Sequence, residues 1–403
     1  MSKCVAITGI GLVNPLGIGK KKFWDNLIAG KNAVQIITRF DPKHLPVQVA
    51  GQIDGFNPKD FLPSRLAVKM DRFAHYAVAA SKLALDDADI DLQEYDPYRV
   101  GVWFGNNAGG WDICERGLFE LYRDGAPFVN PWQATAWFPT SPQGYVSITY
   151  GIKGMCKSFI CDRASGASAL YFAVRAILEG ECDLILAGGT EAPLTPFGII
   201  CYYETGVLAS STQNLNVYRP FDKLRSGTVL GEGSTVLILE KLEDAESRGA
   251  NIYGKLYLGS MTTDADGVNN KNYQYSQVRA LANANLSVDD IDVIYPEAAG
   301  TLASDLVEAE AIQEVFRSNL KVHIACPKAS YGHLYGASTA TDIAVGLLAA
   351  KNQVLPPTIN TEFLDDGLDL NIQSQPVSGS FSNMLFSSRA REGSNVSMSV
   401  ISN

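Results

Sequence analysis

Short apolar runs rich in β-branched residues alternate with segments of helical spacing, and this alternation constrains the fold most strongly. Strand-like runs cover residues 5–13, 100–105, 158–162, 183–187 and 228–240, and helical patterns cover residues 68–88, 111–122 and 164–180. Runs that are apolar throughout are typical of strands buried on both faces by covering helices. The pattern therefore predicts an α/β protein with largely buried strands.

A similar alternation restarts after about residue 250. It contains strand-like runs at 252–258, 293–295 and 322–325, helical patterns at 276–285, 303–315 and 336–350, and further strands from residue 380. Two α/β halves, residues 1–250 and 251–403, indicate a pseudo-duplicated fold.

The composition excludes several classes of function. A net charge of −10 argues against a surface that binds nucleic acid or anionic membranes. Seven cysteines without any CxxC spacing argue against a metal site and a disulfide framework. No apolar stretch is long enough for a bilayer and the N-terminus enters a strand-like run, so we expect a cytoplasmic protein without signal peptide or membrane span.

Glycines near the N-terminus raise the question of a dinucleotide-binding loop. Gly9, Gly11 and Gly17 follow the first strand-like run, but their spacing is not GxGxxG, and Pro15 interrupts the turn. A tight connection between strand and loop is the favoured interpretation.

The most informative segment is residues 159–170, FICDRASGASAL, where a strand ends, the chain turns and a helix rich in small residues begins. Such an elbow presents one side chain at a helix N-terminus, where backbone N–H groups and the dipole would lower the pKa of a cysteine thiol. The segment resembles the nucleophile elbow of the β-ketoacyl synthases, A-C-S-S-G followed by a helix. In the alignment on Ser165-Gly166 and Ala169-Leu170, Arg163 occupies the family's cysteine position.

Further matches to this family are collinear along nearly the whole chain. They are the opening strand at residues 5–11, RPFD at 219–222, GEG at 231–233 with LE at 239–240, and LPPTIN at 355–360. The resemblance implies a thiolase fold with five layers in the order α-β-α-β-α.

The same resemblance shows which catalytic elements this chain lacks. The family's first histidine, in E-A-H-G-T, corresponds to Ala299, whereas its lysine and second histidine correspond to Lys328 and His333. The loop F-G-F-G-G is replaced by RAREG at residues 389–393. Arg163 cannot form a thioester and Ala299 cannot donate a hydrogen bond, so the chain is not expected to condense acyl groups alone.

Arg163 opposes the dipole of the following helix and needs a partner if it is buried. We expect it to pair with a nearby carboxylate or backbone carbonyls and to block the vestigial pocket. Cys161 is an alternative nucleophile, but a thiol still on the strand would be buried with a raised pKa, which favours a structural role. Lys328 and His333 are interpreted as remnants kept for packing and hydrogen bonding, with partial chemistry such as malonyl decarboxylation as the alternative.

The non-cysteine elbow, the E-A-A-G sequence and the S-R-x-R-x-G loop together resemble the chain length factor, or ketosynthase-β, of bacterial type II polyketide synthases. That subfamily typically has glutamine at the elbow and commonly arginine where His333 stands, so this chain departs from it twice. The resemblance implies a heterodimer with an active ketosynthase-α. It also implies that the partner binds the phosphopantetheine of an acyl carrier protein, so no cofactor is expected in this chain. The growing polyketide would extend from the partner's cysteine into a tunnel whose floor this chain forms.

The family's chain-length gate follows a G-G pair and corresponds here to Trp111, Cys114 and Leu118. Because these positions are spaced i, i+3 and i+7, they share one face of a helix, which suits a channel wall or, alternatively, an ordinary core stripe. Trp111 is bulky and the other two are modest, so we expect an intermediate chain length.

A second aromatic group follows the predicted gate. Trp132, Trp137 and Phe138 lie within seven positions, and aromatic clusters are enriched at interface cores. They are assigned to the contact with the partner, with a buried loop as the alternative.

Two other functions compete with a length-setting subunit. One is a thiolase-fold acyltransferase or malonyl decarboxylase that uses Cys161 or His333. The other is a homodimeric scaffold for an acyl carrier protein, which the net charge of −10 disfavours because carrier proteins are usually acidic themselves.

Overall fold

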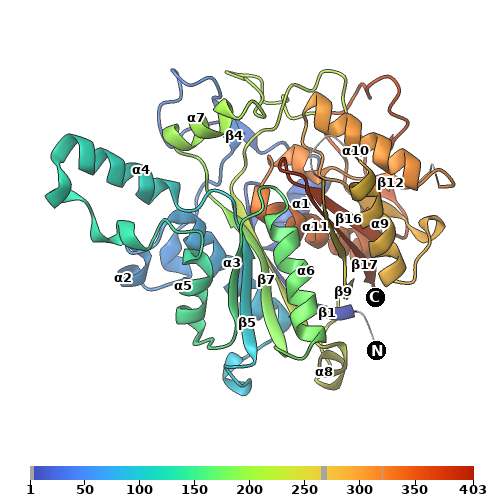
Figure 1. Ribbon diagram of the computed structural model, residues 1–403, viewed down its shortest axis with the longest axis horizontal. Coiled ribbons are helices and arrows are strands. Elements are labelled where there is room, and N and C mark those ends of the chain that lie inside the picture. Colours follow the sequence, from blue (N-terminus) through green and yellow to red (C-terminus); the bar gives the residue numbers. More distant parts are fainter. Residues whose placement is uncertain (1–3, 265–269, 320) are drawn as a thin grey trace.

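The computed structural model describes residues 4–264, 270–319 and 321–403, and its main sheet contains two five-stranded units (Figure 1). The first unit has the spatial order β6-β5-β7-β8-β1 and the second β12-β11-β16-β17-β9. The strands of the first unit are β1 (Cys4–Asn14), β5 (Val100–Gly105), β6 (Cys156–Phe159), β7 (Leu184–Glu191) and β8 (Gly233–Glu240). Those of the second are β9 (Gly254–Tyr257), β11 (Val293–Tyr295), β12 (His323–Ile324), β16 (Asn383–Arg389) and β17 (Ser394–Ser402).

Both units use the same topology. In each unit the first strand along the chain lies at one edge of the unit, and the next three strands are parallel to one another. The fifth strand lies between the first strand and the parallel strands and is antiparallel to both of its neighbours. This repeat confirms the predicted pseudo-duplication. The edge strands β1 and β9 pair with each other in antiparallel register, so the two units form one continuous sheet.

Short strands complete the sheets. β2 (Gly17–Ile18) pairs with β1, β10 (Ser260–Thr263) with β17, and β14 (Asn371–Ile372) with β12. Two separate two-stranded sheets are formed by β3 (Val34–Ile36) with β4 (Val49–Gly51), and by β13 (Val354–Leu355) with β15 (Val377–Ser378).

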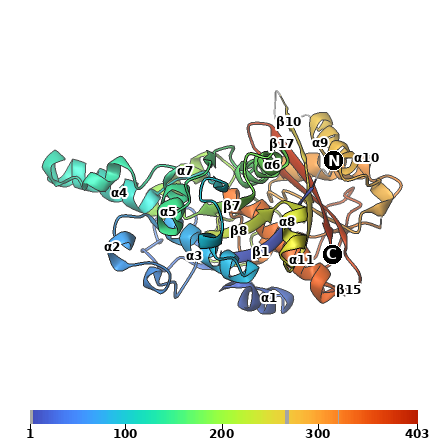
Figure 2. The same ribbon diagram turned by 90° about the horizontal axis from the view of Figure 1, so that it is seen from below.

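Helices cover the two units in layers (Figures 1 and 2). α3 (Arg72–Ala88) and α5 (Ser141–Tyr150) lie on the outer face of the first unit, and α9 (Lys271–Asn283) lies against the second, with α10 (Leu302–Val315) beside it. α6 (Ser165–Leu178) and α11 (Ser338–Asn352) pack against each other and contact strands of both units. The order is therefore α-β-α-β-α, as predicted.

The remaining helices are α1 (Lys20–Ile28), α2 (Ser64–Ala67), α4 (Trp111–Phe119), α7 (Pro196–Glu204) and α8 (Leu242–Ser247). α4 begins a segment, residues 111–138, that projects from the body of the molecule in both views (Figures 1 and 2). We call this segment the arm. Among the described helices, none is long and apolar enough to cross a membrane.

Several expected element boundaries were wrong, among them those of the helix expected at 276–285, which spans Lys271–Asn283, and two cases are instructive. The strand predicted at 228–240 begins only at Gly233, because residues 228–232 are buried by isolated backbone bridges to loops, such as Leu230 with His333. The helix predicted at 68–88 begins at Arg72, since Asp71 has extended backbone and its carboxylate accepts the N–H of Ile113. At 228–232 the pattern reflected burial rather than regular hydrogen bonding, whereas Val68 is 74% exposed, so the first residue of the predicted helix lies at the surface.

The glycines of β1 allow the strand to approach α3 closely. A Cβ atom on Gly11 would lie 1.9 Å from the carbonyl oxygen of Ala80, and one on Gly9 would lie 2.3 Å from that of Ala84. Both glycines lie inside β1 rather than at a connection between strand and loop, which corrects the expected position. Their role is to permit backbone contact across the first two layers.

We predict that Gly11→Ala lowers the free energy of unfolding by about 1–3 kcal/mol or more, because the added methyl group meets backbone that cannot move independently. Chemical denaturation measures the change. Gly144→Ala is the matched control: Gly144 lies in α5 with open space around its Cβ position, and alanine favours helix. Equal stability of the two variants would contradict the close contact.

Candidate functional site

The elbow forms where β6 ends at Phe159 and α6 begins at Ser165. Asp162 adopts a left-handed backbone conformation with φ of 48°, which reverses the chain. The Ser165 hydroxyl accepts the N–H of Cys161 at 2.8 Å and donates to the carbonyl of Asp162 at 2.6 Å. These contacts hold the turn and place Arg163 at the position that the sequence assigned to the nucleophile.

Arg163 is buried, with 5% of its surface exposed. Its Nε atom lies 3.5 Å from Asp162 Oδ2 and 3.8 Å from Glu297 Oε1. Burial disfavours the charged form, but the carboxylates of Glu297 and Asp162 outweigh it and raise the pKa of Arg163. The expected pairing of Arg163 with a nearby carboxylate is confirmed.

Glu297 is the central anion of the site. Its Oε1 accepts a hydrogen bond from His333 Nε2 at 2.5 Å, and its Oε2 accepts the Ser388 hydroxyl at 2.6 Å and the backbone N–H of Arg389 at 3.2 Å. Burial opposes ionisation, yet His333, Arg163 and Lys328 lower the pKa of Glu297 to about 2. Glu297 is therefore a carboxylate at neutral pH.

His333 is held in one tautomer. The backbone N–H of Tyr335 donates to its Nδ1 at 3.0 Å, so the ring proton lies on Nε2 and is donated to Glu297. Burial, opposed by Glu297, lowers the pKa of His333. The imidazole is neutral, and both of its nitrogens are engaged within the protein.

Lys328 is engaged to the same degree. Its Nζ donates to the carbonyls of Pro296 at 2.7 Å and Glu297 at 3.1 Å, and it lies 2.8 Å from Asp342 Oδ2. Burial lowers the pKa of Lys328, but Asp342 and Glu297 raise it by a larger amount, so the pKa lies above its ordinary value. Three acceptors match the three donors of an ammonium group.

Ala299 is buried within a fixed backbone loop. The carboxylate of Glu308 in α10 accepts the N–H groups of Glu297 and Ala298 at 2.8 Å each, and the Ala299 carbonyl accepts the Thr228 hydroxyl. The loop is held firmly, but a methyl group stands where the family has an imidazole. Within the described residues, no group of three or more His, Cys, Asp or Glu side chains is placed to hold a metal ion.

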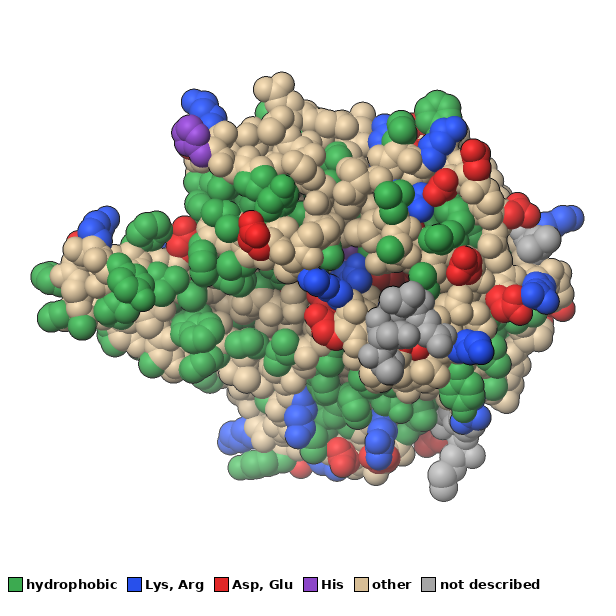
Figure 3. Space-filling view, turned by 45° about the horizontal axis from the view of Figure 1, so that its top comes forward, with side chains coloured by type: hydrophobic (Ala, Val, Ile, Leu, Met, Phe, Trp, Pro, Cys, Tyr) green, Lys and Arg blue, Asp and Glu red, His purple; other side chains and the backbone are tan. Residues whose placement is uncertain are grey.

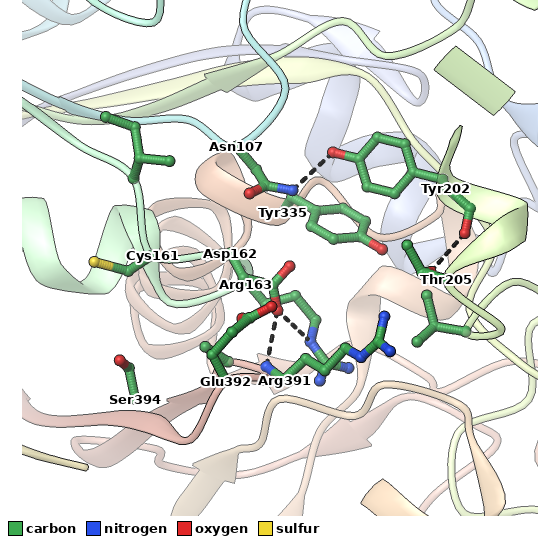
Figure 4. A pocket seen from close by; sticks show the side chains of 13 residues that line it. Asn107, Cys161, Asp162, Arg163, Tyr202, Thr205, Tyr335, Arg391, Glu392 and Ser394 are labelled. Atoms are coloured by element: carbon green, nitrogen blue, oxygen red, sulfur yellow. Dashed lines mark hydrogen bonds and ion pairs between the residues drawn. The ribbon is translucent and has the colours of Figure 1, made fainter. Parts of the chain in front are cut away.

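A cavity of about 450 Å³ opens beside the elbow (Figure 4). Arg163, Cys161, Tyr202, Tyr335 and Arg391 are among the residues that line it. Arg163 lines this cavity, and its blocking of the vestigial pocket stays a prediction. Cys161 differs from expectation: β6 ends two residues earlier, and Cys161 is a half-buried loop residue rather than a strand residue.

The loop that replaces F-G-F-G-G closes one side of this cavity. The backbone N–H of Arg391 donates to Asp162 Oδ2 at 2.9 Å, which ties the loop to the elbow. Arg389 Nη2 lies 3.5 Å from Asp264 Oδ2, and its guanidinium lies over the ring of Tyr273 at 5.7 Å. Hydrogen bonds and charge contacts of Arg389 and Arg391 therefore hold this loop against the rest of the site.

The three predicted gate residues lie on α4, as expected, and all are half-buried. The Trp111 ring packs against Phe197 of α7, with centroids 5.3 Å apart. None of the three lines the cavity at the elbow. The loop before α4 is positioned by Glu191, whose buried carboxylate accepts the N–H groups of Asn107 and Ala108.

The arm carries a concentration of exposed apolar side chains (Figure 3). Trp132, Trp137 and Phe138 are exposed over 36%, 37% and 43% of their surfaces. Other exposed apolar residues of the arm are Phe119, Leu121, Tyr122 and Phe128. The three predicted interface residues therefore lie at the surface and not in a buried loop.

Sequence reasoning missed the partners that complete the site. The motifs do not predict that Glu297 compensates Arg163, that Asp342 pairs with Lys328 or that Ser388 donates to Glu297. Asp342 carried a usable signal, because it is the only acidic residue in the otherwise apolar and small-residue α11. A lone acid in a buried helix indicates a buried ion pair.

The fold and the site define a thiolase-fold protein with the plan of a condensing enzyme and no nucleophile at its elbow. The models of the β-ketoacyl synthase N-terminal and C-terminal domains match residues 2–245 and 259–362. The chain belongs to the β-ketoacyl synthase family.

Two curated relatives illustrate its position in that family. The tetracenomycin polyketide synthase ketoacyl synthase beta subunit of Streptomyces glaucescens is 35% identical over 371 residues, which cover 91% of this chain and 90% of the relative. A 3-oxoacyl-(acyl-carrier-protein) synthase 2 of Staphylococcus aureus is 32% identical over 377 residues, covering 92% and 91%. The first of these supports the predicted resemblance to ketosynthase-β subunits.

Solved structures agree along the whole chain. The ishigamide ketosynthase/chain length factor superposes with a TM-score of 0.92 at 26% identity, and 100% of both chains is covered. A second match is a chain from the structure of a type II polyketide synthase acyl carrier protein in complex with its ketosynthase bound to the hexaketide. Its TM-score is 0.89 at 26% identity, again over 100% of both chains. The predicted thiolase fold is confirmed.

We predict that Glu297→Gln destabilises the protein by about 3–5 kcal/mol at pH 7, because Arg163 keeps only Asp162 of its two carboxylates while His333 and Ser388 lose their anionic acceptor. The folded-state pKa of Glu297 lies below the ordinary 4.5, so its stabilising contribution is present above that value and is lost as pH falls toward about 2. The difference in the free energy of unfolding between wild type and variant should therefore become smaller as the pH falls from 4.5 toward about 2. Denaturation at several pH values measures it.

Glu392→Gln is the matched control, since Glu392 lies exposed at the cavity rim. It should change stability by less than about 0.5 kcal/mol. A Glu297 variant as stable as this control at pH 7 would show that the buried charges do not depend on Glu297.

Proposed function

We propose that this chain is the non-condensing, length-setting subunit of a type II polyketide ketosynthase. It forms a heterodimer with an active ketosynthase-α and contributes the floor of the tunnel into which the partner extends the polyketide. The acyl carrier protein delivers its phosphopantetheine-bound units to the partner. The similarity to a ketosynthase beta subunit and to a ketosynthase/chain length factor structure supports this assignment.

One observation carries the non-condensing part of the proposal: a buried guanidinium takes the place of the nucleophile. Arg163 is held by Glu297 and Asp162, and a methyl group stands at Ala299. Condensation needs a thiolate to hold the acyl chain and donors to stabilise the enolate formed on decarboxylation. The thiol and the first histidine are absent from their family positions, and the remaining donor of His333 is directed at Glu297.

An independent acyltransferase or decarboxylase is the less favoured function. His333 donates to Glu297 and accepts from Tyr335, so it has no free donor for a substrate enolate. Cys161 is half-buried, and its backbone supports the turn through Ser165. A homodimeric scaffold remains the third function, and a stable homodimer that ignores a co-expressed ketosynthase would favour it.

The arm supports the heterodimer. Projecting segments with exposed aromatic side chains are costly on an isolated protein and typical of partner interfaces. The aromatic residues of the arm, Trp132, Trp137 and Phe138 among them, provide such a surface. We assign the contact with ketosynthase-α to this arm.

The length-setting step is steric. Trp111, Cys114 and Leu118 share the half-buried face of α4 at the base of the arm, next to the proposed interface. A polyketide entering across that interface extends until another two-carbon unit would overlap the Trp111 indole. Overpacking of this kind costs about 1–3 kcal/mol or more, so cyclisation or release then overtakes elongation.

We predict that Phe138→Ser weakens association with the co-expressed ketosynthase by about 2 kcal/mol, or about thirty-fold, because an interface anchor is lost. Co-purification and titration of the two subunits measure the effect. Phe363→Ser is the matched control: Phe363 is also an exposed phenylalanine, but it lies far from the arm in the sequence and outside it. Equal affinity of the two variants for the ketosynthase would show that the arm is not part of the interface.

We predict that Trp111→Gly lengthens the product by one or more two-carbon units in the reconstituted synthase, since the bulkiest residue of the gate is removed. Mass spectrometry of the products measures their length. Phe363→Ala removes an exposed aromatic ring outside the arm and should leave the length unchanged. Unaltered product length in the Trp111 variant would refute the gate.

A further inference from the structure

A second cavity, of about 410 Å³, lies between α1, the loop that follows β1 and the segment that follows β4. It shares no lining residue with the cavity beside the elbow, and no residue of the arm lines it. Figure 2 shows α1 on a different side of the molecule from the arm. The proposed function therefore leaves this second cavity unused.

Amide side chains dominate the lining of this cavity. They are Asn14, Asn26, Asn32, Gln35 and Gln52. Asn14 is only 1% exposed, and its Oδ1 accepts the backbone N–H of Leu16 at 2.9 Å, but its Nδ2 has no partner among the described residues. A buried donor without an acceptor costs free energy, so this amide points to a polar molecule that completes the cavity.

Two opposite charges at the same cavity lack a charged partner. Lys22 makes no ion pair or hydrogen bond within the part of the chain that the structure describes. Asp54 is held by amides alone, since its Oδ1 accepts Gln52 Nε2 at 2.6 Å and its Oδ2 accepts Gln35 Nε2 at 2.7 Å. The carboxylate is thus fixed in position, while no cation of the described residues compensates its charge.

The two charges select the class of ligand. A simple anion would be attracted by Lys22 and repelled by Asp54, and a simple cation would meet the reverse. A zwitterion gains from both charges, and its carboxylate can also accept from Asn14. We propose that this cavity binds a small polar amino acid as the zwitterion, with Lys22 as the partner of its carboxylate and Asp54 as the partner of its ammonium group.

The size and polarity of the cavity agree with such a ligand. A volume of about 410 Å³ suits a small molecule, and the amide lining offers hydrogen bonds to a polar side chain. The site is formed by this chain alone and is independent of the proposed contact with a ketosynthase.

Serine, glycerate and serinamide test the proposal, because they are nearly equal in size and differ in charge. Ligand-observed NMR titrations of the full chain are made at about pH 6, where the amine of serinamide is protonated. Serine should bind saturably and at least about tenfold more tightly than either analogue, since each analogue loses one charge-assisted contact. Absence of saturable serine binding would overturn the proposal. Equal or tighter binding of glycerate or serinamide would make the cavity a site for a single charge and would overturn it as well.

Two variants assign the charges of the site. Lys22→Gln should weaken serine binding about fivefold or more and abolish the preference for serine over serinamide, while the preference over glycerate remains. Asp54→Asn should weaken binding equally and abolish only the preference over glycerate. Both side chains are exposed, so either substitution leaves the fold intact.

Lys21→Gln is the matched control. Lys21 neighbours Lys22 on α1 and is also exposed, but it pairs with Asp25 at 2.7 Å and does not line the cavity, so serine binding should be unchanged. Equal effects of the Lys21 and Lys22 variants would show that serine binds elsewhere. The comparison holds in a complex with a co-purified ketosynthase, because only this chain differs.

Discussion

A buried positive charge has to be neutralised where it lies, and the neutralisation of Arg163 organises this protein's centre. Glu297 performs it while also accepting hydrogen bonds from His333, Ser388 and the backbone of Arg389. One carboxylate thereby connects the elbow of the first half to two segments of the second, the loop at His333 and the end of β16. Because removal of either charge leaves the other buried, the arrangement is maintained as a unit.

This charge network explains how a condensing-enzyme fold persists without a thiol and the first histidine at their family positions. In an active relative the same positions would hold a thiol and two imidazoles aimed at substrate. Here the remaining imidazole and ammonium groups, His333 and Lys328, have every donor directed at protein acceptors. The donors of these two catalytic remnants are used within the protein, so the surfaces that remain for function are the arm, with its exposed aromatic side chains, and the cavity beside the elbow.

Local sequence signals predicted the elements well where packing and hydrogen bonding coincide, as in β5 and α6. They failed where burial occurs without regular structure: residues 228–232 are buried under loops but form only isolated bridges, and Cys161 follows the end of β6 although the apolar run continues to Ile160. The glycines of β1 show the converse. Their pattern indicated a turn, whereas the contact with α3, formed by residues far away in the chain, requires them inside the strand.

The sequence by itself determined the fold family and the missing chemistry, because collinear motifs specify the fold and an arginine or alanine lacks a thiol or imidazole wherever it lies. It also placed Trp111, Cys114 and Leu118 on one helix face, since helical spacing is a local property. Only the tertiary structure decided which carboxylate compensates Arg163, which way the guanidinium turns, and whether space remains beside it. Those outcomes depend on distances between residues more than a hundred positions apart, which no local pattern encodes.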